Sequence, residues 1–315
     1  MKRLLLTMLL SLGLLHSAQA AEELGFAYQD RIADAASIIA VDQGFFTEFG
    51  VTIQRYRFSS GAATAEALYS GAADIGTMGD TAALILLARN PGLTILASHG
   101  GGEGRHRLVT RADLQLHSPA ELAGLTLAVK KGTSTYGGLL SYLQAHQLPL
   151  SSLKLVDMRP SEMAPALAAG SVDIICASEP TPSLAEQQGG HAFDDLAGLG
   201  NDYPILLLAS SSYASRHPQQ IANFLRAMAK AVDFINNNPR QAATIVARKT
   251  GLSEELTDRA MQRHVYALKL DTNTLASLKK TGQMLLNAGK IPALPDLIKR
   301  SAQEYLAAAH QQSAL

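Results

Sequence analysis

Ala67-Leu68-Tyr69-Ser70-Gly71-Ala72-Ala73-Asp74-Ile75 returns 99 positions later as Ala166-Leu167-Ala168-Ala169-Gly170-Ser171-Val172-Asp173-Ile174, so that both stretches read A-L-x-x-G-x-x-D-I. Glycine suits the left-handed residue that ends a helix, because it has no Cβ. The β-prone residues after it favour a strand. Each copy therefore predicts a helix, a glycine turn and a strand, and the pair predicts two similar α/β halves. The alternative is a chance match between two ordinary helix ends.

Predicted strands and helices alternate on both sides of each copy. In the first half, strands are expected at 24–29, 51–58, 73–78 and 94–98, with helices at 33–43, 61–69 and 81–88. In the second half, strands are expected at 125–130, 153–158 and 172–177, with helices at 135–146 and 161–169. This order predicts an α/β fold with a mostly parallel sheet flanked by helices in each half. A strand at 205–209 and then helices complete the chain.

The restart of the pattern predicts two lobes that face one cleft. We expect a signal peptide at 1–20, a first lobe at 21–108, a second lobe at 109–206, and a return to the first lobe at 207–315. The crossings are expected near Leu108–Ala112 and Tyr203–Leu207. The glycine-rich run 100–104 reads as a flexible crossover, and Arg105 or Arg107 after it could reach an anion in the cleft.

The first twenty residues have the features of a secretory signal peptide. A basic start at Lys2-Arg3 precedes an apolar run and an A-x-A site, which predicts cleavage after Ala20 and export to the periplasm. An uncleaved anchor is the alternative, although the apolar run is short for a membrane span.

Composition narrows the possible partners. Loss of Lys2 and Arg3 leaves 25 basic and 27 acidic residues, and this balance argues against a nucleic-acid partner. The single cysteine, Cys176, permits no intrachain disulfide. Because it lies in an apolar run, we expect it to be buried in a strand.

Five loops are predicted to meet where the strands end, which is where ligands bind in open α/β sheets. The candidate ligand-binding residues in them are Gln29, Arg31, Ser60, Gly61, Asp80, Thr81, Gly132, Thr133, Ser134, Thr135 and Glu179. The turns at 59–61 and 132–135 each open a helix with hydroxyl residues, and such helix starts can bind an anion. Ordinary helix caps are the alternative reading.

Asp80 and Glu179 are also 99 positions apart, each just past a predicted strand. Paired carboxylates can act as acid and base, hold an ammonium group or hydroxyls, or form hinge salt bridges. Together with an anion subsite, they suggest a small anionic or zwitterionic ligand.

No motif for a metal, a phosphate loop or a catalytic nucleophile is complete in this sequence. There is no H-E-x-x-H or C-x-x-C, and residues 132–136 miss the G-x-S-x-G pattern at Tyr136. Accordingly we expect no cofactor, no metal and no catalytic residue.

Several stretches together carry a family resemblance. They are Phe26-Ala27-Tyr28-Gln29, Gln43-Gly44-Phe45-Phe46 before Gly50-Val51, Ser60-Gly61, Gly79-Asp80, Ser118-Pro119-Ala120-Glu121-Leu122-Ala123-Gly124 and the two repeated motifs. In order and spacing the chain resembles the periplasmic substrate-binding proteins of ABC importers for taurine, aliphatic sulfonates and nitrate, with the related pyrimidine-precursor binders.

The resemblance implies a two-lobe, type II periplasmic binding fold that closes on a small ligand by a hinge motion. It also implies a monomer that docks on an ABC permease in the inner membrane. Ser178-Glu179-Pro180 departs from the family's usual aromatic and Ala-Pro, and the chain has no Trp. Two other roles remain open, an enzyme of pyrimidine-precursor or lyase type on the same fold, and a ligand sensor for a membrane receptor.

Overall fold

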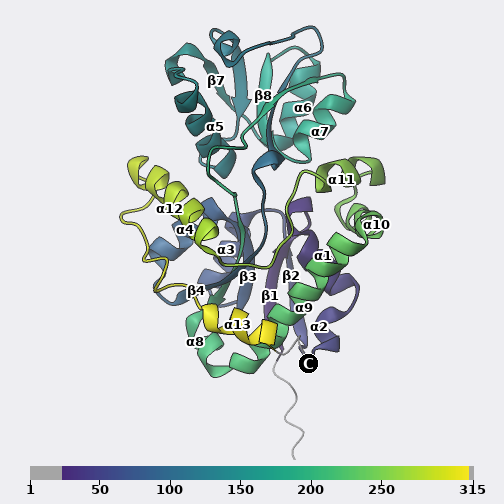
Figure 1. Cartoon of the computed structure of the whole chain (residues 1–315), viewed down its shortest axis with the longest axis vertical. Helices are drawn as coiled ribbons and strands as arrows, with labels where there is room; N and C mark the ends of the chain where they lie inside the picture. The colour runs from purple at the N-terminus through teal and green to yellow at the C-terminus, as the bar shows by residue number, and fades with distance from the viewer. Residues whose placement is uncertain (1–22, 312–315) are drawn as a thin grey trace, which may run out of the picture.

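A computed structural model describes residues 23–311, so the predicted signal peptide and its cleavage after Ala20 lie outside the described residues. The chain forms two lobes stacked along its long axis, each built on a five-stranded sheet with flanking helices (Figure 1). Within the described part, no helix is both long enough and apolar enough to span a membrane.

The first sheet has the strand order β2-β1-β3-β10-β4. Its strands are Ile53–Phe58 (β2), Leu24–Gln29 (β1), Ile75–Gly79 (β3), Ile205–Ser210 (β10) and Leu93–Gly100 (β4). β1 runs parallel to β2 and β3, whereas β10 is antiparallel to both of its neighbours. The first lobe therefore contains one strand, β10, that follows the second lobe in the sequence and is inserted beside β3.

The second sheet repeats this layout with the order β7-β6-β8-β5-β9. Its strands are Lys154–Asp157 (β7), Thr126–Val129 (β6), Ile174–Ser178 (β8), His106–Thr110 (β5) and His191–Asp195 (β9). β5 is antiparallel to β8 and β9, so it occupies the place that β10 has in the first sheet. Each lobe thus receives its antiparallel strand just after the chain crosses over from the other lobe.

Two strands of the second sheet were not expected from the sequence. β5 and β9 lie where crossover or loop was expected, and the boundary placed at residue 108 falls inside β5. The polar pair His106-Arg107 obscured β5, because a buried strand normally reads as apolar. Both side chains are nevertheless buried, since His106 contacts Thr135 and Arg107 pairs with Glu179.

The helices follow the expected alternation. Those between the strands are Ala35–Asp42 (α1), Phe45–Glu48 (α2), Gly61–Tyr69 (α3), Asp80–Arg89 (α4), Ser134–Ala145 (α5), Pro160–Ala168 (α6) and Thr181–Gln187 (α7). After β10 come Ser211–Arg216 (α8), Pro218–Asn237 (α9), Pro239–Thr250 (α10), Glu254–Met261 (α11), Thr272–Asn287 (α12) and Gln303–Gln311 (α13). Short 3-10 turns lie at Ile32–Asp34, Glu103–Arg105, Pro119–Leu122 and Leu150–Ser152.

The repeated motif has the same structure in both lobes. α3 and α6 begin 99 residues apart, as do β3 and β8. Gly71 and Gly170 end their helices with φ of 77° and 70°, the left-handed region that glycine tolerates. The motif acids also correspond, because Asp74 accepts from the Gly25 N–H and Asp173 from the Thr126 N–H, each at 2.8 Å. In each lobe the acid bonds the turn to the neighbouring parallel strand, which is β1 in the first sheet and β6 in the second.

Each lobe has its own hydrophobic core. In the first lobe, Phe26 of β1 meets Phe46 and Phe224 at ring-centroid distances of 5.6 and 5.0 Å, which packs α2 and α9 against the sheet. In the second lobe, Cys176 is buried in β8 among apolar side chains, as the sequence predicted. With separate cores, the lobes can move relative to each other while each stays folded.

The C-terminal segment contacts both lobes. α13 packs on α9 and β4 of the first lobe, whereas α11 packs on α7, and α12 lies against α4 and α5 (Figure 1). Between α11 and α12 the chain follows the first crossover, where Val265 pairs with Gly101 and Lys269 with Ser98. Gly102 of the first crossover also donates to the Asp202 carbonyl of the second crossover, so three segments of the chain run side by side between the lobes.

We expect the substitutions Gly71→Ala and Gly170→Ala each to lower the free energy of unfolding by about 1 kcal/mol, because an L-residue is strained at these positive φ values. Urea unfolding followed by circular dichroism would measure the loss. Asn at either position should cost less, since Asn tolerates the left-handed region. Gly104→Ala is the matched control, since a Cβ there meets nothing within 4 Å and its φ is not positive. Equal stability of all these variants would contradict the structural role of the motif.

Candidate functional site

A cleft of about 760 Å³ lies between α3 and α4 of the first lobe and the start of α5 in the second. Six of the residues predicted from the sequence line it, namely Arg31, Gly61, Thr81, Gly132, Thr133 and Ser134. The facing sides of α3 and α4 add apolar side chains, namely Ala62, Ala65, Ala82, Ile85 and Leu86, together with Tyr69 and the charged Glu66 and Arg89. The cleft therefore has a polar end and an apolar wall, which is the usual make-up of a small-molecule site.

Asp80 joins the two lobes at the polar end of this cleft. Its carboxylate is fully buried at the start of α4, where Oδ1 accepts from the Thr81 N–H at 2.7 Å. The same oxygen accepts from the Ser134 hydroxyl of the second lobe, and Oδ2 accepts from the Thr281 hydroxyl of α12 at 2.8 Å. Thr81 and Ser134 hydroxyls are 3.1 Å apart. Three parts of the chain thus meet on one carboxylate.

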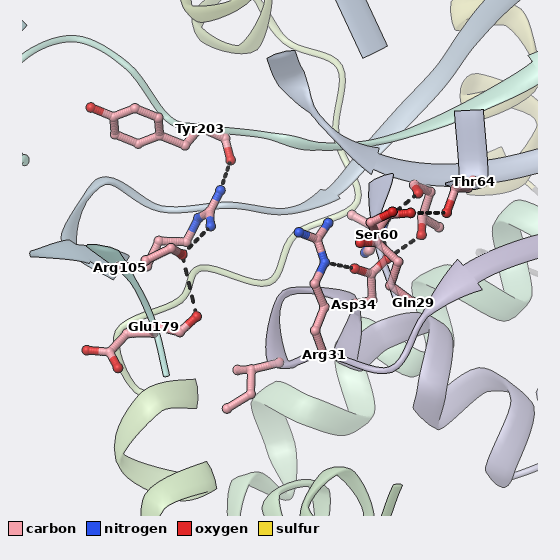
Figure 2. Close-up of polar contacts among 12 residues, drawn as sticks. Gln29, Arg31, Asp34, Ser60, Thr64, Arg105, Glu179 and Tyr203 are labelled. Carbon is pink, nitrogen blue, oxygen red and sulfur yellow. Dashed lines mark hydrogen bonds and ion pairs between the residues drawn. The ribbon is translucent and has the colours of Figure 1, made fainter. Parts of the chain in front are cut away.

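Arg31 supplies positive charge to the cleft. Its Nε donates to Asp34 at 2.5 Å, and the fully buried Asp34 also accepts from the Thr77 hydroxyl. Figure 2 shows the guanidinium of Arg31 between Asp34, to which its Nε is bonded, and Arg105. Its Nη2 is buried, yet it has no hydrogen-bond partner among residues 23–311. Asp34 therefore holds Arg31 in place and leaves its terminal amino group available to a ligand.

The two hydroxyl-rich turns are helix caps in this structure. Ser60 Oγ accepts from the Ala63 N–H at 3.2 Å, and Thr133 Oγ1 accepts from the Tyr136 N–H at 3.3 Å. Both side chains thus act as caps, which the sequence offered as one of two interpretations, and anion binding at these turns stays a prediction. The α5 N-terminus nevertheless faces the cleft through Gly132, Thr133 and Ser134, so its partial positive charge acts there.

Five of the expected residues are not among those that line the cleft, namely Gln29, Ser60, Asp80, Thr135 and Glu179. Gln29 is buried behind Gly61 and donates to the Thr77 carbonyl at 3.3 Å. Thr135 turns into the second lobe, where its hydroxyl lies 2.8 Å from His106 Nδ1. Both side chains support the site from behind.

Glu179 is the largest correction, because its carboxylate does not face Asp80 across the cleft. It accepts from Arg107 at 3.0 Å and from the Ser183 N–H at 3.3 Å, and Figure 2 shows it turned away from Arg31. The buried Arg107 draws the acid into the second lobe, because a buried guanidinium needs a counter-charge. Hence the two acids at the 99-residue offset do not form a pair.

Other polar residues near the hinge were missed by the sequence analysis or left undecided there. Arg105 is buried between the two crossovers, where it donates to the Ser178 hydroxyl at 2.8 Å and to the Tyr203 carbonyl at 2.9 Å. His264 is buried nearby, and its Nδ1 lies 2.8 Å from the Ala260 carbonyl. The only sequence signal for this buried polar region was the position of Arg105 directly after the glycine-rich run 100–104. Thr281 and His264 gave no signal, because they lie far along the chain.

Burial controls protonation in this region. It lowers the pKa of Arg105 to about 10, with repulsion from Arg31 as the next cause, so Arg105 stays charged at neutral pH. Burial, followed by repulsion from Arg105, lowers the pKa of His264 to about 3, so that this ring is neutral. Within the described residues there is no group of three or more His, Cys, Asp or Glu side chains placed to hold a metal ion.

Comparison with known proteins identifies the family to which this chain belongs. A model of the family described as NMT1/THI5 like matches residues 33–242, which is more than half of the chain. The chain belongs to this family. The taurine-binding periplasmic protein of Escherichia coli (strain K12) is 24% identical over 304 residues, covering 91% of this chain and 93% of that protein.

Solved structures share the fold of this NMT1/THI5-like protein. The periplasmic aliphatic sulphonate binding protein SsuA from Escherichia coli superimposes with a TM-score of 0.81 at 21% identity, covering 89% of this chain and 91% of that one. The desulfurization enzyme DSZB gives a TM-score of 0.75 at 17% identity, covering 92% and 99%. At such identities the likeness establishes the two-lobe fold and leaves the ligand and the chemistry to the site itself.

We expect Ser134→Ala to open the NMT1/THI5-like protein, because it removes the hydroxyl that joins the second lobe to Asp80. A hydrogen bond to a charged group contributes roughly 1.5–3 kcal/mol, enough to raise the open population at least tenfold. Small-angle X-ray scattering of the ligand-free protein should show a larger radius of gyration. Ser141→Ala on the same helix is the control, and equal radii for Ser134→Ala and wild type would contradict the role of this contact.

Stability of the NMT1/THI5-like protein should fall as the pH drops from about 6.5 to about 4. Burial lowers the pKa of His99 to about 4, so the unfolded chain binds a proton in this range that the folded chain excludes. The loss for this histidine is about 3 kcal/mol. His99→Leu should reduce the pH dependence of urea unfolding by the share of one histidine, while buried histidines such as His264 keep the remainder, and the exposed His117→Gln should leave it unchanged. An unchanged slope in His99→Leu would refute the assignment.

Proposed function

We propose that this protein is the periplasmic solute-binding component of an ABC importer, exported by a signal peptide cut after Ala20. It acts as a monomer, holds a small organic anion between its lobes, and delivers it to a permease in the inner membrane. The observation that carries the proposal is the cleft itself, in which Arg31 and the start of α5 face an apolar wall. A taurine-binding periplasmic protein among its relatives supports the same role.

The two acids singled out from the sequence are already engaged, which favours a plain anion over a zwitterion. Asp80 already accepts three hydrogen bonds from the protein, and Glu179 is paired with Arg107. Neither carboxylate is therefore free to bind a ligand ammonium group. The apolar side chains of α3 and α4 instead suit a hydrocarbon tail, since burial of each CH₂ group contributes about 0.8 kcal/mol.

Closure follows from contacts that exist only when the lobes are together. A ligand that bonds to Arg31 of the first lobe and to the α5 N-terminus of the second gains both sets of bonds only in the closed form. Shifting the lobes from 1:99 to 99:1 closed requires about 5.5 kcal/mol of differential affinity. Charge-assisted hydrogen bonds contribute roughly 1.5–3 kcal/mol each, so about two strong bonds or about four weaker ones are enough.

An enzyme with a cysteine nucleophile would need a thiol in the cleft, and Cys176 does not line it. Although the fold is shared with a desulfurization enzyme, the single cysteine of this chain is buried in β8, and burial raises the pKa of its thiol. A thiolate nucleophile is therefore not supported. A sensor would use the same binding site, so the proposal of an importer depends on the partner that the closed form recognises.

Isothermal titration calorimetry with alkanesulfonates of one to six carbons should show affinity rising about fourfold per carbon until the apolar wall is filled. Taurine should bind more weakly than propanesulfonate, because Asp80 and Glu179 are already engaged by the protein and Glu66, the remaining acid that lines the cleft, is exposed to solvent, where an ion pair contributes little. Arg31→Gln should weaken all members of the series tenfold or more, and Arg57→Gln, an exposed arginine paired with Asp30, should not. Tightest binding of taurine, or of inorganic sulfate or nitrate, would overturn the proposed ligand class.

A further inference from the structure

We propose that Arg105 is a second cationic contact for the ligand, so that Arg31, which lines the cleft, and the buried Arg105 together hold its oxyanion group. The inference rests on the proposed function and adds to it the place where the anionic group binds. It is carried by the surroundings of Arg105, which differ from those of the other buried arginine on the same segment.

Arg105 is a buried cation without a counter-charge. Only 4% of the residue is exposed, and its hydrogen bonds go to two neutral acceptors, the Ser178 hydroxyl and the Tyr203 carbonyl. Across residues 23–311, no carboxylate lies within ion-pair distance of it, and its Nε has no partner. Asp80 attracts it electrostatically, but both oxygens of Asp80 already accept hydrogen bonds.

Arg107, two residues further along the chain, is a buried arginine whose charge is balanced within the protein. It is equally buried at 4% exposure, but it pairs with Glu179 at 3.0 Å and also with Glu186. Burying an unpaired charge costs several kcal/mol, which is why buried charges are normally paired. The absence of a counter-charge for Arg105 therefore requires an explanation. An anionic ligand would provide that counter-charge.

Further unpartnered polar atoms gather around Arg105. They are Arg31 Nη2, His106 Nε2 and His264 Nε2, each buried and without a hydrogen-bond partner in the described part of the chain. Arg31 and His264 both interact electrostatically with Arg105, which places the three groups in one neighbourhood. Buried polar atoms are normally satisfied, so several unsatisfied atoms in one place indicate a site built for a polar group.

The position of Arg105 would couple binding to closure. It belongs to the 3-10 turn of the first crossover and is bonded to Tyr203 in the second crossover and to Ser178 at the end of β8. Arg31 follows β1 of the first lobe, and Figure 2 shows the two guanidinium groups on opposite sides of a common space. An oxyanion between them cancels their repulsion and draws the first lobe toward the hinge.

The test compares Arg105→Gln with Arg107→Gln, using hexanesulfonate as the probe in calorimetry on the folded protein. Gln keeps amide donors near Ser178 and Tyr203 but removes the charge. We expect Arg105→Gln to lose at least tenfold in affinity, and Arg107→Gln to lose stability while keeping affinity within about threefold. Equal affinity of Arg105→Gln and wild type would overturn the inference and leave the proposed function intact. No binding of any alkanesulfonate by wild type would instead defeat the proposed function.

A measurement on the unaltered protein covers the case in which Arg105→Gln does not fold. The Nε–H resonance of Arg105, assigned in a nitrogen–proton correlation spectrum by its loss in Arg105→Lys, should shift on addition of methanesulfonate. The corresponding resonance of Arg107, whose charge is already paired, should stay in place. A shift of neither resonance, although hexanesulfonate binds, would show that the anion sits elsewhere in the cleft.

Discussion

The carboxylate of Asp80 is the contact on which the closed arrangement depends. It is buried at the N-terminus of α4 and receives hydrogen bonds from α4 itself, from Ser134 of the second lobe and from Thr281 of the returning chain. An uncompensated buried charge is costly, so the N–H and hydroxyl donors that bond to this carboxylate stabilise the arrangement in which they contact it. The polar end of the cleft, the docking of α12 and the approach of the lobes all follow from this one requirement. It also explains why this acid is not available to a ligand cation.

The two lobes share a fold but contribute different chemistry to the site. Asp74 and Asp173 perform the same task, because each bonds a glycine turn to the neighbouring parallel strand, β1 or β6. Asp80 and Glu179 have diverged, since Arg107 draws Glu179 into the second lobe and leaves Asp80 alone at the lobe contact. As a result, the first lobe supplies a cation and an apolar wall, and the second supplies a helix N-terminus. Similar halves thus produce an asymmetric cleft, which suits a ligand with one charged end.

Much of this fold was predictable because its signals are local. β1 and α3 have the expected bounds, and the 99-residue offset is kept by helix, glycine and strand. β5 escaped prediction because His106 and Arg107 are buried only through partners from other segments, Thr135 and Glu179. At the site, Arg31 and Ser134 were found from their places after strands, but Thr281 lies 201 residues from Asp80 and carries no motif. Residues that the fold brings together from distant segments form no motif of fixed sequence spacing, so the sequence alone does not reveal them.

The contrast between two arginines shows how far charge pairing can guide functional inference. Arg105 and Arg107 are equally buried and close in sequence, so neither composition nor burial separates them. Their partners do, because Arg107 meets two carboxylates and Arg105 meets only neutral oxygens. A fold selected for stability alone would pair or remove such a charge, since replacing buried ions by apolar groups is often neutral or favourable. Retaining Arg105 uncompensated at the hinge makes sense if the compensating anion arrives with the ligand, and in that case binding and lobe closure are one electrostatic event.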